Sequence, residues 1–284
     1  MKLDGRKMSD NVDDRRGRSV GKAPLSIGGL IIVGLIVWLT GGNPLEFLSQ
    51  QAASGISSQS TDYTPSAEDE KAANFAKVIL KGTEDVWTEI FAQNGMQYTP
   101  PEMVLFSGTT RSECGNASSS TGPFYCPLDQ KLYIDLSFFK QMEGQLNAGG
   151  DFAYAYVIAH EVGHHVQKLL GTLDKVQAQQ QRLSEKESNQ LNVRLELQAD
   201  FYAGVWAYHD NKDFSSLEDG DIEEGLNAAS QIGDDRLQME AQGYTVPDSF
   251  NHGTSAQRAR WLKKGLQRGN ISDGDTFSIP YSQL

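Results

Sequence analysis

The chain has 284 residues and a formal net charge of −12 at pH 7, enough for one or two domains with a hydrophobic core. The charge is uneven, because residues 1–24 carry seven basic against four acidic side chains and the remainder is strongly acidic. No dense run of Lys and Arg interrupts that acidic remainder, so the composition argues against a nucleic-acid-binding surface.

The first predicted element is a membrane anchor. Residues 23–45 contain no charged residue, and the sequence LSIGGLIIVGLIVWL within them is almost entirely apolar. A helix of this length can span roughly 30 Å of hydrocarbon, and the basic residues before it favour an N-terminus inside the cell. We therefore expect a cytoplasmic segment at 1–23 and a single transmembrane helix at 24–45 in the cell (inner) membrane. A cleavable signal peptide is the alternative, but acids precede the apolar run and no small-x-small site closely follows it.

The remainder is expected to lie outside the cytoplasm. Residues 46–65 are rich in Ser, Gln, Ala and Thr without apolar periodicity, which is typical of a flexible linker. A folded domain is predicted at 66–284. Helical spacing of apolar or polar residues predicts helices at 67–93, 152–170, 174–189, 190–209, 219–231, 233–242 and 254–267. The sequences MVLFSG (103–108) and KLYIDLSFF (131–139) predict strands. The predicted fold class is therefore α+β, mostly helical with a small sheet.

The two cysteines of the chain, Cys114 and Cys126, flank a loop rich in Ser and Gly. Outside the cytoplasm such a pair predicts one disulfide that closes the loop. Without a paired C-x-x-C motif, a zinc site built on these cysteines is not expected.

The sequence VIAHEVGHHVQKLL at 157–170 predicts a metal site. Successive residues of an α-helix are 100° apart, so His160 and His164 project from one face, 40° apart, whereas His165 points elsewhere and is assigned only a packing or surface role. Glu161 lies beside the pair without ligating. This is the H-E-x-x-H arrangement of zinc peptidases, with two imidazole ligands to zinc and the glutamate as general base. The alternative is a set of core histidines satisfied by hydrogen bonds.

The third ligand must come from elsewhere in the chain. Glu196 and Asp200, in RLELQADFYAG, are four residues apart and share a helix face. This spacing favours Glu196 as the ligand, with Asp200 bonded to an imidazole. Asp174, ten residues after His164, is the alternative ligand.

The chain contains a short N-terminal segment, SDNVDDRRG, a single apolar span, and the motifs FYCPLDQKLYIDLSFF, HEVGHHVQ, ELQADFYAG and HGTSAQRARW. In this combination it resembles the bacterial neutral zinc metallopeptidase family, membrane-anchored proteins of the zincin type. The resemblance covers nearly the whole chain. More remotely, H-E-x-x-H followed by E-x-x-A-D is similar to the CAAX prenyl proteases and heat-shock membrane peptidases. In those enzymes the glutamate of the second motif is the third ligand, which supports Glu196. Their downstream His and Arg imply His252 as a catalytic residue and Arg258 as its neighbour, both candidates for stabilising an oxyanion. Gly253 departs from the proline of these relatives, and a histidine that only belongs to a loop or helix cap is the alternative for His252.

The predicted function is that of a membrane-anchored zinc peptidase that hydrolyses peptide bonds of a peptide or protein outside the cytoplasm. The substrate is expected to add as a strand along KLYIDL, at 131–136. One alternative is a membrane-tethered zinc-binding scaffold or chaperone-like pseudo-peptidase without turnover. Another is a structural zinc with Asp174 as a fourth ligand.

Overall fold

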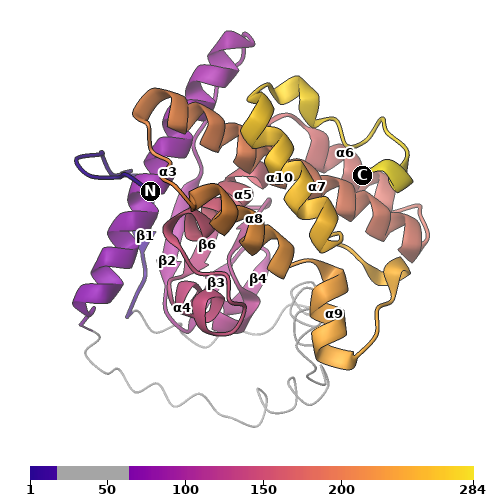
Figure 1. Ribbon diagram of the computed structural model, residues 1–284, viewed down its shortest axis with the longest axis horizontal. Coiled ribbons are helices and arrows are strands. Elements are labelled where there is room, and N and C mark those ends of the chain that lie inside the picture. The colour runs from indigo at the N-terminus through magenta and orange to yellow at the C-terminus, as the bar shows by residue number, and fades with distance from the viewer. Residues whose placement is uncertain (18–63) are drawn as a thin grey trace.

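The computed structural model describes residues 1–17 and 64–284 (Figure 1). No helix within these two ranges is long and apolar enough to cross a membrane. The predicted anchor at 24–45 and almost all of the predicted linker at 46–65 lie outside the described residues.

Most of the described chain is helical, which confirms the predicted mostly helical α+β class. The helices are α3 (Ala67–Gln93), α4 (Ser137–Gly144), α5 (Asp151–Leu169), α6 (Thr172–Gln180), α7 (Glu185–Phe214), α8 (Asp221–Gln231), α9 (Asp234–Gln242) and α10 (Ser255–Arg268). Three of them begin at capping boxes, in which Ser66, Ser184 or Thr254 exchanges hydrogen bonds with the residue three positions later.

The start of α7 differs from the prediction of two helices at 174–189 and 190–209. The helical run breaks at 181–184, and α7 then continues without interruption to Phe214. The capping box of Ser184 and Glu187 explains this boundary, because the Ser184 side chain accepts a hydrogen bond from the Glu187 backbone N–H and starts a new helix there.

The strands form one mixed sheet and one separate hairpin. The sheet has the order β1 (Val12–Asp14), β2 (Glu102–Phe106), β6 (Lys131–Asp135), β5 (Phe124–Cys126), and the hairpin pairs β3 (Thr109–Ser112) with β4 (Gly115–Ser118). β1, β2 and β6 run parallel, and β5 runs antiparallel to β6.

The predicted strand at 131–139 is shorter than expected, and its predicted role is wrong. It ends at Asp135, whose side chain accepts a hydrogen bond from the backbone N–H of Ser137 at the start of α4 (2.9 Å). β6 also lies between β2 and β5, so neighbouring strands occupy both of its edges. A substrate strand therefore cannot add to KLYIDL; among the described strands, β1 and β5 form the edges of this sheet.

The N-terminal segment packs against the domain predicted at 66–284. Val12 lies opposite Met103 in the parallel pairing of β1 with β2. Figure 1 shows the N-terminal trace running beside α3 and the sheet. The short sequence VDD, flanked by charged residues, has too few apolar positions for period-two patterning to reveal a strand.

Helix α7 lies at the centre of the helical part and packs against both α5 and α10 (Figure 1). At the crossing with α10, Gly204 of α7 faces Gly265 of α10. A Cβ at Gly204 would lie 2.3 Å from the backbone oxygen of Leu262 and 2.7 Å from the backbone nitrogen of Leu266. The two helices therefore approach each other through their backbones, and this close approach sets how α10 lies against α7.

We expect Gly204→Ala to destabilise the protein, because the added methyl group must push two helix backbones apart. Overpacking of this kind costs about 1–3 kcal/mol, which lowers the thermal midpoint by roughly 2–4 °C per kcal/mol for a domain of this size. Thermal unfolding of the full chain, followed by circular dichroism, measures it. Gly144→Ala is the matched control, since nothing lies within 4 Å of a Cβ there, and it should leave stability unchanged or slightly raised. Equal midpoints for the two variants would contradict the close helix crossing.

Candidate metal centre

His160 and His164 lie one turn apart on α5, and both Nε2 atoms point to the carboxylate of Glu196 on α7. The His160 Nε2 lies 3.2 Å from Glu196 Oε2, and the His164 Nε2 lies 3.4 Å from Oε1. One ligand atom from each residue lies within 4.8 Å of the others. In the part of the chain that the structure describes, this is the one group of His, Cys, Asp or Glu side chains arranged to hold a metal ion.

The donor set fits zinc. Two imidazole nitrogens and a carboxylate oxygen are typical of a catalytic zinc with three protein ligands. The two nitrogen–oxygen separations, 3.2 Å to Oε2 and 3.4 Å to Oε1 of Glu196, together with the 4.8 Å that contains one ligand atom of each residue, leave these atoms close enough to share one ion.

The close crossing of α5 and α7 brings these ligands together. A Cβ at Gly163 of α5 would lie 3.0 Å from the backbone oxygen and 3.1 Å from the Cα of Ala199 on α7. Glu196 and Asp200 flank Ala199 on the same helix, so the short distance between the backbones places both acids beside the histidines.

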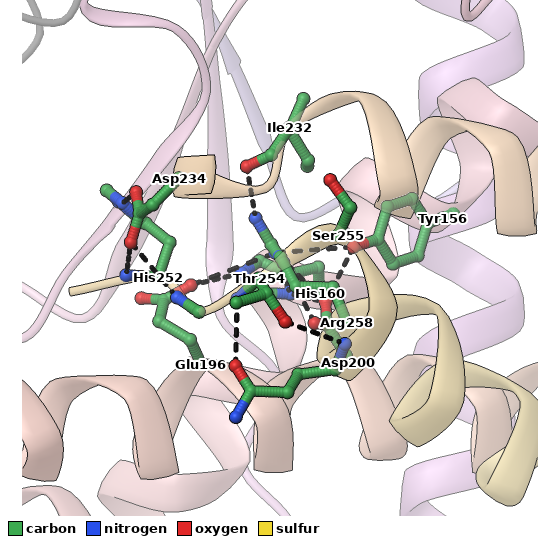
Figure 2. Close-up of polar contacts among 12 residues, drawn as sticks. Tyr156, His160, Glu196, Asp200, Ile232, Asp234, His252, Thr254, Ser255 and Arg258 are labelled. Carbon is green, nitrogen blue, oxygen red and sulfur yellow. Dashed lines mark hydrogen bonds and ion pairs between the residues drawn. The ribbon is translucent and has the colours of Figure 1, made fainter. Parts of the chain in front are cut away.

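The orientation of His160 is set by a buried carboxylate. Asp200 is fully buried, and its Oδ1 lies 2.8 Å from His160 Nδ1 (Figure 2). Because a carboxylate accepts, the Nδ1 carries the proton and the Nε2 lone pair is left for a metal. The same oxygen accepts from the Tyr156 hydroxyl (2.6 Å), and the guanidinium of Arg258 donates to both oxygens (2.9 and 3.0 Å). Burial raises the pKa of Asp200, but Arg258 and His160 lower it to about 2.

His164 is oriented by a side chain that the sequence did not single out. Its Nδ1 lies 2.9 Å from Oε1 of Gln167, which is fully buried. The amide of Gln167 donates in turn to the backbone oxygen of Leu195 on α7 (2.7 Å). Each ligand histidine is thus bonded through Nδ1 and offers Nε2 to the metal. The three-residue spacing on one helix is the sequence signal that could have identified Gln167.

Glu161 is buried beside the ligands but is not one of the three. Burial raises the pKa of its carboxyl group, and His160 and His164 lower it, with a net rise. The backbone of Tyr125 in β5 is a smaller cause that lowers this pKa. The carboxylate therefore lies near both the ligand histidines and β5.

His252 lies in the loop before α10 and is held by Asp234. The His252 Nδ1 lies 3.0 Å from Asp234 Oδ1, and Asp234 Oδ2 accepts the backbone N–H groups of Asn251, His252 and Gly253 at 2.7–3.1 Å. Figure 2 shows this pair beside Glu196, whose charge contributes to the raised pKa of His252. Burial opposes that rise, and the hydrogen bond to Asp234 is its main cause. Asp234 is almost fully buried, and sequence analysis did not identify it.

Arg258 and Gly253 each have a specific place around this loop. The guanidinium of Arg258 donates hydrogen bonds to Asp200 and to the Tyr156 hydroxyl (3.2 Å). Arg258 therefore holds Asp200 in place, and Asp200 in turn orients the ligand His160. Gly253 has a φ of +95°, which proline cannot adopt because its ring holds φ near −65°. The departure from the proline of distant relatives is therefore a requirement of this backbone.

A comparison with known families identifies the family of the chain. Residues 1–277 match the family described as putative neutral zinc metallopeptidase. The chain belongs to this family. The resemblance seen in the sequence motifs is thereby confirmed, and the His160, His164 and Glu196 cluster is the candidate metal centre of a family member.

Relatives of this metallopeptidase family member include proteins of Escherichia coli and Mycobacterium tuberculosis. The chain is 47% identical over 285 residues to "Uncharacterized protein YpfJ" of E. coli K12, covering 98% of this chain and 99% of the relative. It is 47% identical over 191 residues to "Uncharacterized protein Rv2575" of M. tuberculosis H37Rv, covering 64% of each. No solved structure matches the chain.

His165 has a larger role in this family member than packing alone. It is buried, and its Nε2 lies 2.7 Å from the backbone oxygen of Thr99, which can only accept. The Nε2 therefore carries the proton, and Nδ1 accepts from the Tyr125 hydroxyl (3.0 Å). Burial lowers the pKa of His165, which favours this neutral form. His165 thus links the metal-binding helix α5 to the edge strand β5.

Asp174 and the two cysteines, which the sequence also singled out, lie away from the metal ligands. Asp174 of α6 is exposed and pairs with Lys168 (2.7 Å) instead of joining the cluster. Cys114 and Cys126 form the predicted disulfide, which is confirmed. Cys126 is the last residue of β5, so the disulfide joins the end of the edge strand to the turn between β3 and β4.

Glu196→Ala should abolish stoichiometric zinc binding, because it removes one of three ligands. The loss in affinity should exceed the roughly 10–100-fold cost of removing an outer partner of a ligand. Metal content after dialysis, measured by mass spectrometry, tests this. Asp174→Ala is the control and should keep one zinc per chain. The reverse pattern would make Asp174 the ligand.

Gln167→Met should weaken zinc binding by about 10–100-fold, since His164 loses the acceptor that orients its ring. Titration of the purified protein against a competing chelator measures the affinity. Gln177→Met, at an exposed position of α6, is the matched control and should bind zinc as the wild type does. An unchanged affinity in Gln167→Met would remove Gln167 from the site.

Proposed function

We propose that this protein is a zinc-dependent peptidase that hydrolyses peptide bonds by a zincin-type mechanism. The observation that carries the proposal is the three-ligand cluster with Glu161 beside it but outside the ligand set. Three protein ligands leave a coordination position for water or substrate, whereas a structural zinc has four. The surface ion pair of Asp174 with Lys168 provides no fourth ligand.

Glu161 is the general base of this proposal. Zinc, when bound, lowers the pKa of a water and polarises a carbonyl group. Glu161 accepts the proton of the attacking water and delivers it to the leaving amine. Its buried position beside the ligands, without being one of them, suits a group that must both accept and release a proton.

His252 is the proposed donor to the developing oxyanion. Asp234 accepts from its Nδ1, so the Nε2 donates to a substrate when the imidazole is protonated on both nitrogens, a form that the raised pKa of His252 favours. A hydrogen bond aimed at the carbonyl oxygen stabilises the transition state more than the ground state, because negative charge develops on that oxygen. Asp234 orients His252 through one ring nitrogen, as Asp200 orients His160.

The proposed binding surface for substrate is the outer edge of β5. One edge of β5 pairs with β6, and Tyr125 of β5 lies near enough to Glu161 to influence its pKa. The other edge of β5 has no partner strand among the described residues. An extended peptide or protein segment that adds to this edge by backbone hydrogen bonds would present its carbonyl group to Glu161 and the metal.

The proposed location of this activity is outside the cytoplasm, at the cell membrane. The disulfide between Cys114 and Cys126 supports an oxidising compartment, and the uncharged residues 23–45 support attachment to a membrane. A zinc-binding scaffold or pseudo-peptidase without turnover is the competing function. The position of Glu161 favours the enzyme, because a scaffold needs no base beside its metal.

The test compares the wild type with Glu161→Gln in the full chain, purified in detergent and loaded with zinc. We expect hydrolysis of peptides from a broad library by the wild type and a loss of about 10²–10⁴-fold in the variant. Zinc content should stay at one per chain, because Glu161 is not a ligand.

Glu185→Gln is the control, since Glu185 is exposed at the start of α7, and its activity should equal that of the wild type. A wild type that binds one zinc but hydrolyses no peptide would favour the scaffold. Undiminished hydrolysis in Glu161→Gln would remove the proposed base.

A further inference from the structure

The N-terminal arm, defined as residues 1–17, is built into the metallopeptidase domain. Its side chains supply hydrogen bonds to two buried carboxylates of the domain, Asp210 and Glu84, and its backbone completes one edge of the sheet. These three contacts come from α7, α3 and β2, which are far apart in the sequence.

Asp210 of α7 is fully buried, and the arm provides its counter-ion. Arg6 donates through Nη1 to Oδ2 (2.9 Å) and through Nη2 to Oδ1 (2.5 Å). Among the described residues, the hydrogen bonds to this carboxylate side chain come from Arg6. A buried carboxylate that loses its only partner is strongly destabilising.

Helix α3 leaves space for this ion pair. A Cβ at Gly82 would lie 2.8 Å from Arg6 Nη2 and 2.8 Å from Asp210 Oδ1. Any larger residue at this position would collide with the pair. The absence of a side chain at Gly82 therefore fits the presence of Arg6 between α3 and α7.

Glu84, also on α3, is the second buried carboxylate. Its Oε1 accepts from the Ser9 hydroxyl (2.5 Å) and from the Asn11 amide (2.7 Å). Lys81 of the same helix lies further away, at 3.6 Å from Oε2. The arm thus provides the two short hydrogen bonds that compensate for the burial of Glu84.

The backbone of the arm completes the sheet. The backbone N–H of Met103 donates to Asn11 (2.9 Å), and that of Arg15 donates to Leu105 (2.7 Å). Met103 and Leu105 of β2 are fully buried. Without β1, a buried strand of the domain would have an open edge with unpaired N–H and C=O groups.

We infer that residues 1–17 and 64–284 fold as one unit in one compartment, on the same side of any membrane to which the chain is attached. If the two ranges lay on opposite sides of a membrane, the arm could not reach Asp210, Glu84 and β2. The disulfide assigns the shared compartment to the outside of the cytoplasm. This inference does not depend on the proposed peptidase activity.

Two arginines among the basic residues that predicted a cytoplasmic arm form ion pairs in the structure. Arg6 pairs with Asp210, and Arg16 pairs with Asp14 (2.6 Å) and with Glu70 of α3 (2.8 Å). These arginines are counter-ions of the domain and of the arm itself. Their charge is therefore explained without assigning it to the retention of the N-terminus inside the cell.

The experiment labels single introduced cysteines in the full chain with a membrane-impermeant maleimide. Lys7→Cys reports on the arm and Lys263→Cys on α10; both positions are exposed, and the native cysteines are joined in the disulfide. We expect both thiols to react in intact spheroplasts.

Reaction of both variants only after lysis would still place the arm and domain together, in the other compartment. Reaction of one variant before lysis and the other only after lysis would overturn the inference. Zinc content and peptide hydrolysis are not part of this readout, so failure of the proposed function leaves it unaffected.

A charge swap tests the docking itself. We expect Arg6→Asp to lower the thermal midpoint of the purified full chain by roughly 5–15 °C, and the double variant Arg6→Asp, Asp210→Arg to recover much of that loss. Lys7→Asp makes the same charge change at the neighbouring exposed position and should shift the midpoint by less than about 2 °C. If Arg6→Asp and Lys7→Asp behave alike, the arm is not docked and the inference fails.

Discussion

The carboxylate of Asp200 is the point on which the arrangement of three helices depends. It lies on α7, accepts from His160 and Tyr156 of α5, and accepts two hydrogen bonds from Arg258 of α10. A fully buried carboxylate must have all of these partners in place, because unpaired charge inside a protein is costly. The same group therefore fixes the relative positions of the helices and the orientation of a metal ligand. Fold and metal site share one electrostatic requirement.

Two glycines let the helices come close enough for these hydrogen bonds to form. Gly163 lets α5 approach α7 at Ala199, and Gly204 lets α10 approach α7 from another side. Side chains as short as Asp and Glu reach across such crossings, whereas helices that lay further apart would need longer side chains to make the same contacts. The metal site is thus a consequence of how closely these backbones lie, in addition to which ligands the sequence provides.

Within one helix, the sequence predicted which side chains lie together. Regular geometry alone selects His160 and His164 and sets His165 aside, because 100° per residue is independent of the rest of the fold. Glu196 needed the further support of a family resemblance, since its approach depends on how two helices cross. Asp234 could not be found, because its partner His252 is eighteen residues away and nothing in local periodicity joins them.

The helices of the fold were also largely predictable, since apolar spacing and capping residues act locally. The sheet was not. β5 has three residues and β1 has three, too few for period-two alternation to be distinguished from chance. Both strands are edges whose place depends on distant partners. The sequence therefore favoured the more apolar β6 as the strand to which a substrate would add, although β6 is an interior strand.

The long sequence separations of the arm have a consequence for the order of events during synthesis. Arg6 and Asp210 are 204 residues apart, so at typical rates of translation Arg6 leaves the ribosome roughly 10–40 s before its partner. Residues 24–45 are made early in that interval, long before α7 can fold. The arm is thus complete while its binding site on α7 does not yet exist. Docking of the arm onto α7 must therefore wait until the chain has been made at least as far as Asp210.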